Sequence, residues 1–427
     1  MIRRVTDNQL VKNRFAFLKL RDLRCVFGAT LVSQLGDGVV NVALAFAVLN
    51  LTHGSATDLA VVFALRTVAQ VSGLLIGGVV ADRVSRRGLM MASDLTRFVG
   101  QAVIGVLLVT HDATLLEVIV SQMVLGAAGG FFNPASAGLI PAVAGDYLQE
   151  ANAMQGIAGA SSGIAGAALG GVLATTLGPS AALLVDAGSY ALSALFLSLV
   201  SSAATAVEPS DEPGGTFLSD LKGGFAEVRS RSWLWSLIIS FAFTNALAGS
   251  FEVLGPLICR KYYDGPPAFA LLSVMFGVGA IGGGFLLLHL KPKRPLLVGV
   301  TLCLPLTLPS FLLAAHAPLV AILPFSVLGG AGPIMFNTLW WTTLQQHVPR
   351  EAISRVISFD FAGSYALSPL GVLAAGPVAV AIGVPAAFVV FGGAGLLVTA
   401  SNFLNRDVRT LKALPPSEAD GVVVAGV

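Results

Sequence analysis

The hydrophobic pattern of this 427-residue chain is a series of long apolar runs separated by short polar or Pro/Gly-containing breaks. A run of about 20 apolar residues is long enough to cross a bilayer as a helix. The chain is therefore predicted to be an all-α polytopic membrane protein. The breaks predict twelve spans, at 25–50, 57–80, 94–110, 115–138, 151–175, 179–203, 233–258, 267–290, 295–315, 318–343, 353–380 and 384–404.

One long polar interior segment, 205–232, divides these spans into two equal sets. It predicts a cytoplasmic linker between an N-terminal six-helix bundle at 25–204 and a C-terminal six-helix bundle at 233–405. The segments 1–24 and 406–427 are then cytoplasmic tails.

Lysine and arginine positions predict the orientation, because cytoplasmic connections are enriched in these residues. Placing the N-terminus in the cytoplasm puts the basic residues of the tails, the linker and several short loops inside, and leaves Arg260 and Lys261 outside. An even number of spans then places both termini in the cytoplasm. The heavy use of Ala, Gly and Val favours a bacterial origin, and hence the bacterial inner (plasma) membrane.

The composition agrees with a bilayer as the main solvent. Hydrophobic residues make up 55% of the chain and charged residues only 11%, with a mean hydropathy of +0.83. Soluble domains carry about 25% charged residues, so these few charges cannot build a water-soluble surface. A net charge of +2 and the lack of a basic aromatic patch indicate no nucleic-acid partner.

No cluster of residues predicts a metal site, a cofactor or catalysis. Cys25, Cys259 and Cys303 are far apart, and the five histidines lack the spacing of a zinc site. The strings GASSG at 159–163 and GVGAIG at 277–282 match hydrolase and dinucleotide motifs, but both lie inside apolar spans, where glycines favour close helix packing. We therefore expect a protein that is not an enzyme.

An internal repeat supports the division into halves. GAAGGFFNPASAGLIP at 126–141 resembles GGAGPIMFNTLWWTTL at 329–344, with Phe132–Asn133 aligned on Phe336–Asn337. Two six-helix halves related by an axis along the membrane normal would give such a repeat. A coincidence between two glycine-rich segments is the alternative.

Ionisable residues inside spans are costly, by about 2.5–3.5 kcal/mol each on insertion scales, and so indicate function. Asp37, with Gln34 one turn away, is the first candidate for a protonation site, and Arg66 is its expected counter-ion. The alternative is an inert Asp37–Arg66 pair that only fixes helix packing. Glu252 in the seventh span is a second protonation candidate.

Polar and aromatic side chains within spans are candidates for lining a central substrate cavity. Besides Gln34, these are Asn133, Asn245, Asn337 and Trp340. For Trp340, anchoring at the membrane interface is an equal alternative.

The sharpest local motif is GGVVADRVSRRGLM at 77–90, where an apolar span runs into a very short charged loop. Its arginines act as orienting charges at the inner interface. Asp82, beside this basic cluster, is either a helix cap or one member of an ion pair that gates the cytoplasmic side.

This loop resembles the signature G-x-x-x-D-R-x-G-R-R of the major facilitator superfamily. Ser85 replaces its second glycine. LVSQLGDGV at 31–39, FFNPA at 131–135 and LLVDAGSYALSAL at 183–195 resemble helices of the drug:proton antiporter branch, which includes enterobactin and macrolide exporters. The matching loop residues are Gly78, Asp82, Arg83, Arg86 and Arg87.

The resemblance implies a major facilitator fold of twelve transmembrane helices in two pseudo-symmetric six-helix bundles, with alternating access to a midplane cavity. It also implies that Asp82 pairs with Arg355 at the start of the eleventh helix, and that the protein is a monomer. No ATP-binding loop is present, so an ion gradient is expected to supply the energy.

The resulting hypothesis is a secondary active transporter that exports small amphipathic compounds, such as drugs, antibiotics or siderophore-like molecules, in exchange for protons. The antiporter branch carries Gly-Pro in its fifth helix. Here Gly166 and Ala167 take that place, ahead of Gly170 and Gly171. The lost proline favours a facilitator or importer with the same fold as the alternative. A non-transporting membrane sensor is disfavoured because the short tails leave no room for an output domain.

Overall fold

The computed structural model describes residues 20–81, 84–201, 225, 227–290 and 292–414. In these ranges every regular element is helical, and twelve helical segments are long and apolar enough to cross a membrane. The all-α polytopic architecture is therefore confirmed. The chain divides into unit 1 (Met1–Gly54 and Val62–Pro209) and unit 2 (Ser55–Val61 and Ser210–Val427).

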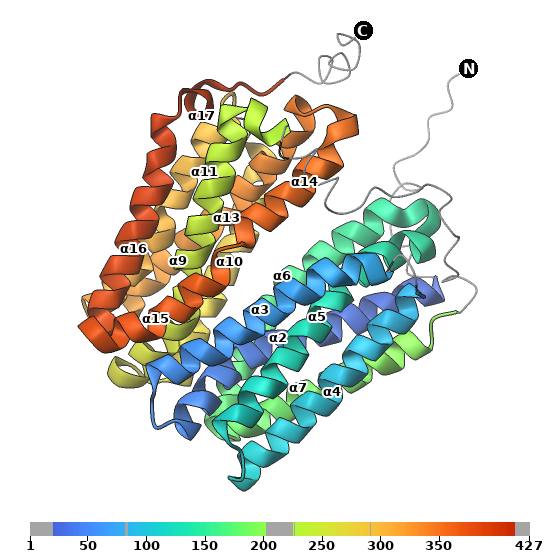
Figure 1. Ribbon diagram of the computed structural model, residues 1–427, viewed down its shortest axis with the longest axis vertical. Helices are drawn as coiled ribbons and strands as arrows, with labels where there is room; N and C mark the ends of the chain where they lie inside the picture. Colours follow the sequence, from blue (N-terminus) through green and yellow to red (C-terminus); the bar gives the residue numbers. More distant parts are fainter. Residues whose placement is uncertain (1–19, 82–83, 202–224, 226, 291, 415–427) are drawn as a thin grey trace. The chain divides into compact units, whose positions relative to one another are not determined.

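Unit 1 contains the first six spans, apart from residues 56–61 at the start of the second span, and is coloured blue to green in Figure 1. Within it α2 packs against α6 and α7, and α4 packs against α5 and α7. The expected linker at 205–232 and both tails lie largely outside the described residues, so the domain boundaries stay predictions. The helices are α2 (Arg21–Leu51), α3 (Ala56–Ala81), α4 (Arg86–Thr110), α5 (Leu115–Ala144), η2 (Gly145–Tyr147), α6 (Leu148–Thr176) and α7 (Pro179–Ser198).

Unit 2 contains the other six spans, coloured yellow-green to red in Figure 1. Here α9 packs against α15 and α16, and α13 packs against α10 and α11. The elements are α9 (Ser232–Tyr262), α10 (Pro266–His289), α11 (Pro295–Cys303), η4 (Leu304–Thr307), α12 (Leu308–Ala314), α13 (Leu319–His347), α14 (Arg350–Tyr365), α15 (Ser368–Ile382), α16 (Val384–Ser401), η5 (Asn402–Leu404) and α17 (Arg406–Thr410).

Local sequence signals fix the starts of α4 and α5. The Ser85 hydroxyl accepts a hydrogen bond from the Gly88 amide at 3.2 Å, which caps α4. Thr114 and Glu117 form a reciprocal capping box at the start of α5. Because α4 begins at Arg86 rather than at residue 94, the third span is longer than expected, and its first half lies within the bundle.

Two spans are interrupted where prolines remove backbone donors. The ninth span passes from α11 through the 3-10 turn η4 into α12, with Pro305 and Pro309 at the starts of the later pieces. The eleventh span consists of α14 and α15, and Pro369 lies in the first turn of α15. These breaks lie in unit 2, whereas each span of unit 1 is a single continuous helix.

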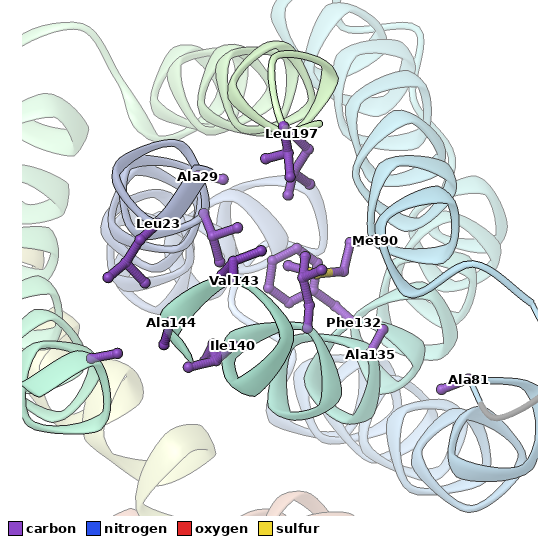
Figure 2. Packing of buried hydrophobic residues seen from close by; sticks show 14 residues of the cluster. Leu23, Ala29, Ala81, Met90, Phe132, Ala135, Ile140, Val143, Ala144 and Leu197 are labelled. Carbon is purple, nitrogen blue, oxygen red and sulfur yellow. The ribbon is translucent and has the colours of Figure 1, made fainter. Parts of the chain in front are cut away.

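Each unit has its own apolar core. In unit 1 the cluster gathers residues of α2, α4, α5 and α7, and Figure 2 shows Met90, Phe132 and Val143 meeting in its interior. In unit 2 the corresponding cluster is richer in aromatic rings and includes Trp233, Phe336 and Trp340. Buried side chains thus hold each bundle together from within, while many large apolar residues remain on the outer surface, as a bilayer requires.

The repeated segments occupy equivalent places in the two units. Phe132 and Phe336 are buried in the cores of their own units, and the asparagines that follow them are exposed. Gly126 on α5 lies against the Arg66 carbonyl of α3, and Gly330 on α13 lies against the Phe276 carbonyl of α10. In both units the fourth span therefore approaches the second through a glycine, which favours the repeat over coincidence.

This contact predicts a sharp difference between neighbouring glycines. A Cβ at Gly330 would lie 1.9 Å from the Phe276 carbonyl oxygen, whereas a Cβ at Gly329 would meet nothing closer than 3.5 Å. We expect Gly330→Ala to destabilise the protein by about 1–3 kcal/mol through overpacking. Gly329→Ala is the matched control and should be neutral or stabilising by up to about 1 kcal/mol, because alanine favours helix.

The measurement is the apparent melting temperature of each detergent-solubilised variant. Equal melting temperatures for the two variants would show that α10 and α13 do not depend on this close approach.

Candidate functional site

The polar centre of unit 1 is the guanidinium of Arg97 on α4. Its side chain is only 5% exposed, and its Nη2 lies 2.5 Å from Asp94 Oδ1. The same nitrogen donates to the Ser33 hydroxyl on α2 at 3.3 Å. Nη1 lies 3.7 Å from Oδ2 of Asp37, also on α2. One buried cation thus joins α2 to α4 and interacts with two carboxylates.

Two aromatic rings cover the guanidinium. Its central carbon lies 4.9 Å from the centroid of Phe132 and 4.3 Å from that of Tyr190. Such cation–π contacts are worth about 2 kcal/mol or more when desolvated. The Tyr190 hydroxyl also donates a hydrogen bond to Asp37 Oδ1 at 2.7 Å, so α7 helps to orient the carboxylate of α2.

The two carboxylates beside Arg97 differ in their access to solvent. Asp94 is fully buried, and its second oxygen accepts a hydrogen bond from the Ser193 hydroxyl at 2.5 Å. Asp37 keeps 40% of its side chain exposed. Because both oxygens of Asp94 already accept strong hydrogen bonds, that group fixes Arg97 in place. Asp37 is the member of the cluster that water, a proton or a ligand can reach.

Glycines bring the helix backbones close together around Asp37. A Cβ at Gly166 would lie 2.6 Å from the Leu35 carbonyl oxygen, and one at Gly170 would lie 2.8 Å from that of Val39. Gly171 is buried beside them. The fifth-helix glycines therefore pack α6 tightly against the part of α2 that carries Asp37.

The structure corrects the expected counter-ion of Asp37. Its ion pair is with Arg97, whereas Arg66 on α3 is half-buried and forms no ion pair among the described residues. The third span was expected to begin at residue 94, which placed Asp94 and Arg97 at its border instead of inside the bundle. A signal was present, since Asp94, Arg97 and Gln101 follow one another at helical spacing and all three are buried.

The second protonation candidate, Glu252, lies exposed on α9 of unit 2. Among the described residues, the ion pairs of a nearly fully buried arginine are those of Arg97 in unit 1.

The loop motif is described in part. Arg86 donates to the Gly138 carbonyl of α5 at 2.8 Å, and Arg87 donates to the carbonyls of Leu197 and Ser198 at 2.8 and 2.6 Å. Cations at the C-terminal end of a helix satisfy carbonyls that lack helical partners. Arg87 therefore fastens the start of α4 to the end of α7.

The roles of the other gate residues stay predictions. Asp82 and Arg83 lie outside the described residues, Gly78 lies on α3, and Arg355 lies on α14, where the described side chains do not include it. The expected pair between Asp82 and Arg355 therefore stays a prediction.

The cavity candidates separate into two groups. Asn133 on α5 and Asn337 on α13 are exposed, and Gln34 on α2 is half-buried. The Asn245 amide instead donates to the Ser364 carbonyl at 2.9 Å, which joins α9 to α14.

Trp340 belongs to the core of unit 2 rather than to a cavity surface or the membrane interface. It is 2% exposed, and its indole N–H donates to Asp360 Oδ2 at 2.9 Å. Its ring packs edge-on against Trp233 and Phe241. A buried indole needs a hydrogen-bond acceptor, and the carboxylate of Asp360 supplies it.

Twelve apolar spans, two units with a shared internal repeat, and a buried charge cluster define an integral membrane transport protein of the major facilitator kind. Residues 26–369 match the Major Facilitator Superfamily, and the chain belongs to this family. It is accordingly a transporter of small molecules and not an enzyme, and a multi-pass protein of a bacterial membrane.

Its relatives include the multidrug efflux pump Tap of Mycolicibacterium fortuitum, 28% identical over 385 residues, which cover 86% of this chain and 91% of that protein. Tap of Mycobacterium tuberculosis is 29% identical, over 84% of this chain and 87% of its own. The uncharacterized MFS-type transporter YvqJ of Bacillus subtilis is also 29% identical, over 69% and 71% of the two chains.

Solved structures confirm the fold. The nucleoside transporter NupG superposes with a TM-score of 0.68 at 12% identity, over 91% of this chain and 99% of that one. A bacterial homolog of the human lysosomal transporter Spinster, in an inward-facing and unoccupied conformation, gives 0.69 at 16% identity, over 93% and 99%.

The charge cluster predicts unequal roles for two arginines. Arg97→Leu leaves the buried Asp94 carboxylate without its cation, and breaking such a pair costs about 3–5 kcal/mol. Arg66→Leu is the matched control and should cost much less, because Arg66 forms no ion pair among the described residues. Thermal unfolding in detergent measures both.

The double variant Arg97→Leu with Asp94→Asn removes the unpaired charge and should recover part of the lost stability. An Arg66→Leu protein as unstable as Arg97→Leu would contradict the assignment of Arg97 as the structural cation.

Proposed function

We propose that this protein is a proton-driven exporter of small amphipathic compounds. Its relatives named multidrug efflux pumps match it over most of both chains, which favours export of drug-like molecules. Charged residues make up only 11% of the chain, and within the spans of unit 1 Arg97 pairs with Asp37 and Asp94. Such an interior suits a cargo with a large apolar surface and little charge.

The observation that carries the proposal is the position of Asp37. Its carboxylate is held by the buried Arg97 and by the Tyr190 hydroxyl, yet 40% of its side chain remains exposed. A proton arriving at Asp37 neutralises the carboxylate and weakens its attraction to Arg97. Protonation therefore changes a contact that joins α2, α4 and α7, which is how an ion gradient can bias a conformational equilibrium. Substrate binding near Asp37 would compete with the proton.

Polar side chains on the exposed faces of the spans support a substrate path. A side-chain amide facing hydrocarbon without partners costs several kcal/mol. The exposed Asn133 in unit 1 and the exposed Asn337 in unit 2 are therefore better placed against water or substrate than against lipid. Gln34, one turn from Asp37, has a buried side-chain oxygen with no hydrogen-bond partner among the described residues. We propose that these three amides contact the cargo.

The loop motif and the charge distribution complete the proposal. We place the Arg86 and Arg87 end of unit 1 and both termini in the cytoplasm, because lysine and arginine are enriched on that side. Asp82 with Arg355 would close the cytoplasmic side, and the protein would act as a monomer. Glu252 is the alternative coupling group if Asp37 serves only to pack α2.

The test is uptake of amphipathic fluorescent drugs into everted membrane vesicles with an imposed proton gradient. Wild-type vesicles should accumulate drug only with the gradient, and Asp37→Asn should reduce accumulation to that of vesicles lacking the protein. Asp112→Asn is the matched control, because Asp112 is exposed in a loop of the same unit, and it should transport like wild type.

Accumulation that ignores the gradient would favour the facilitator or importer. Gradient-driven accumulation that survives in Asp37→Asn but is lost in Glu252→Gln would assign proton coupling to Glu252 on α9.

A further inference from the structure

Unit 1 buries a third carboxyl that the Arg97 ion pairs do not include. Asp186 lies within α7, is 0% exposed, and accepts one hydrogen bond, from the Ser189 hydroxyl at 3.2 Å. Its other oxygen, Oδ2, is buried and has no hydrogen-bond partner among the described residues. A buried ionised carboxylate is stable only when it is paired and its oxygens are hydrogen-bonded. Asp186 meets neither condition in its ionised form.

The fold makes room for Asp186 beside Asp37. A Cβ at Gly36 would lie 2.2 Å from Asp186 Oδ1 and 2.9 Å from the Ser189 Cβ, so only glycine allows α2 and α7 to approach here. Gly36 directly precedes Asp37 in the sequence. One turn further along α7, Tyr190 donates its hydroxyl to Asp37. The two carboxyls therefore occupy the same α2–α7 contact.

The charged groups around Asp186 come from three helices. Asp37 on α2, Arg97 on α4 and Arg66 on α3 interact electrostatically with it. The neighbouring helix α6 carries no ionisable side chain between residues 151 and 176. On α7 itself, Tyr190 faces Asp37 and Arg97. Asp94 on α4 is engaged by Arg97 and Ser193.

The three carboxyls carry more negative charge than the paired arginine compensates. Arg97 is shared by Asp94 and Asp37, and among the described residues Arg66 and Asp186 form no ion pair. Three ionised carboxyls would therefore leave excess negative charge in a low-dielectric interior. A proton on one carboxyl lowers this cost.

Hydrogen bonding selects Asp186 as the carboxyl that carries the proton. Both oxygens of Asp94 accept hydrogen bonds, at 2.5 Å each, and these donors stabilise its ionised form. Asp37 accepts from Tyr190, faces Arg97 and is partly exposed. Only Asp186 combines complete burial with an oxygen that has no donor. The described residues also include no group of three or more His, Cys, Asp or Glu that could hold a metal ion, so a proton suits this oxygen better than a metal.

We propose that Asp186 is a second proton-binding site of unit 1, protonated on Oδ2 at neutral pH while Asp37 and Asp94 are ionised. Its part in transport rests on the proposed proton coupling at Asp37, but its protonation does not. When Asp37 takes up a proton, Arg97 loses one of its two anionic partners, and its field then favours ionisation of Asp186. The charge of each carboxyl therefore acts on the other across the α2–α7 contact.

The experiment is infrared spectroscopy of the purified full-length protein at neutral pH, in a detergent without ester groups. A protonated carboxyl has a C=O stretching band that ionised carboxylates lack. We expect such a band in wild type, at the high frequency of a weakly hydrogen-bonded group and with slow exchange in D₂O. Asp186→Asn should abolish it. Asp37→Glu preserves the charge count and should retain the band, and Asp112→Asn should have no effect.

A wild-type spectrum without the band would overturn the proposal, as would a band that persists in Asp186→Asn. Persistence in Asp186→Asn together with loss in Asp37→Asn would assign the proton to Asp37. The infrared result is independent of the vesicle assay. If the band behaves as expected while drug accumulation ignores the gradient, proton-driven export is wrong and Asp186 is still a proton site.

Discussion

A guanidinium inside an apolar helix bundle must find its counter-charges on the surrounding helices, and the arrangement of unit 1 follows from this requirement. Arg97 takes Asp94 from its own helix, Asp37 and Ser33 from α2, and the ring of Tyr190 from α7. Removing any one partner leaves a buried charge incompletely compensated. The positions of α2, α4 and α7 are therefore coupled through one side chain, and a change in the charge of Asp37 acts on all three helices.

Glycine packing allows these contacts to form. Gly36 gives Asp186 and Ser189 room against α2, and Gly166 brings α6 against the same stretch of α2 from the other side. Without a hydrophobic force between helices in a bilayer, close backbone approach and hydrogen bonds provide much of the association energy. The glycines and the charge cluster thus act on the same helices, because α7, which Gly36 allows to approach α2, also brings the Tyr190 hydroxyl to Asp37.

The all-helical fold, the twelve spans and the internal repeat could be predicted from the sequence, because bilayer thickness dictates the length of each apolar run. Asp37 was found because it interrupts such a run. Its partner was missed because the polar residues Ser85 to Arg87 suggested that the third span starts later than it does. Asp94 and Arg97 then resembled border charges. Trp340 was expected at a cavity or at the membrane interface, because a one-dimensional pattern does not show which helices meet. Its hydrogen-bond acceptor, Asp360, comes from the next span.

The pairing of Asp94 with Arg97 within one helix has a consequence for how the chain enters the membrane. These residues are three positions apart on α4, so each has its counter-charge as soon as that helix forms. Asp37 and Asp186 reside on the first and sixth spans and gain their neighbours only when later or earlier helices dock. During synthesis, the part of α4 that follows Arg86 and Arg87 can therefore insert with its one cation and one anion already paired. The last helix of unit 1, α7, then packs against Arg97, a cation that α4 has already placed in the bilayer.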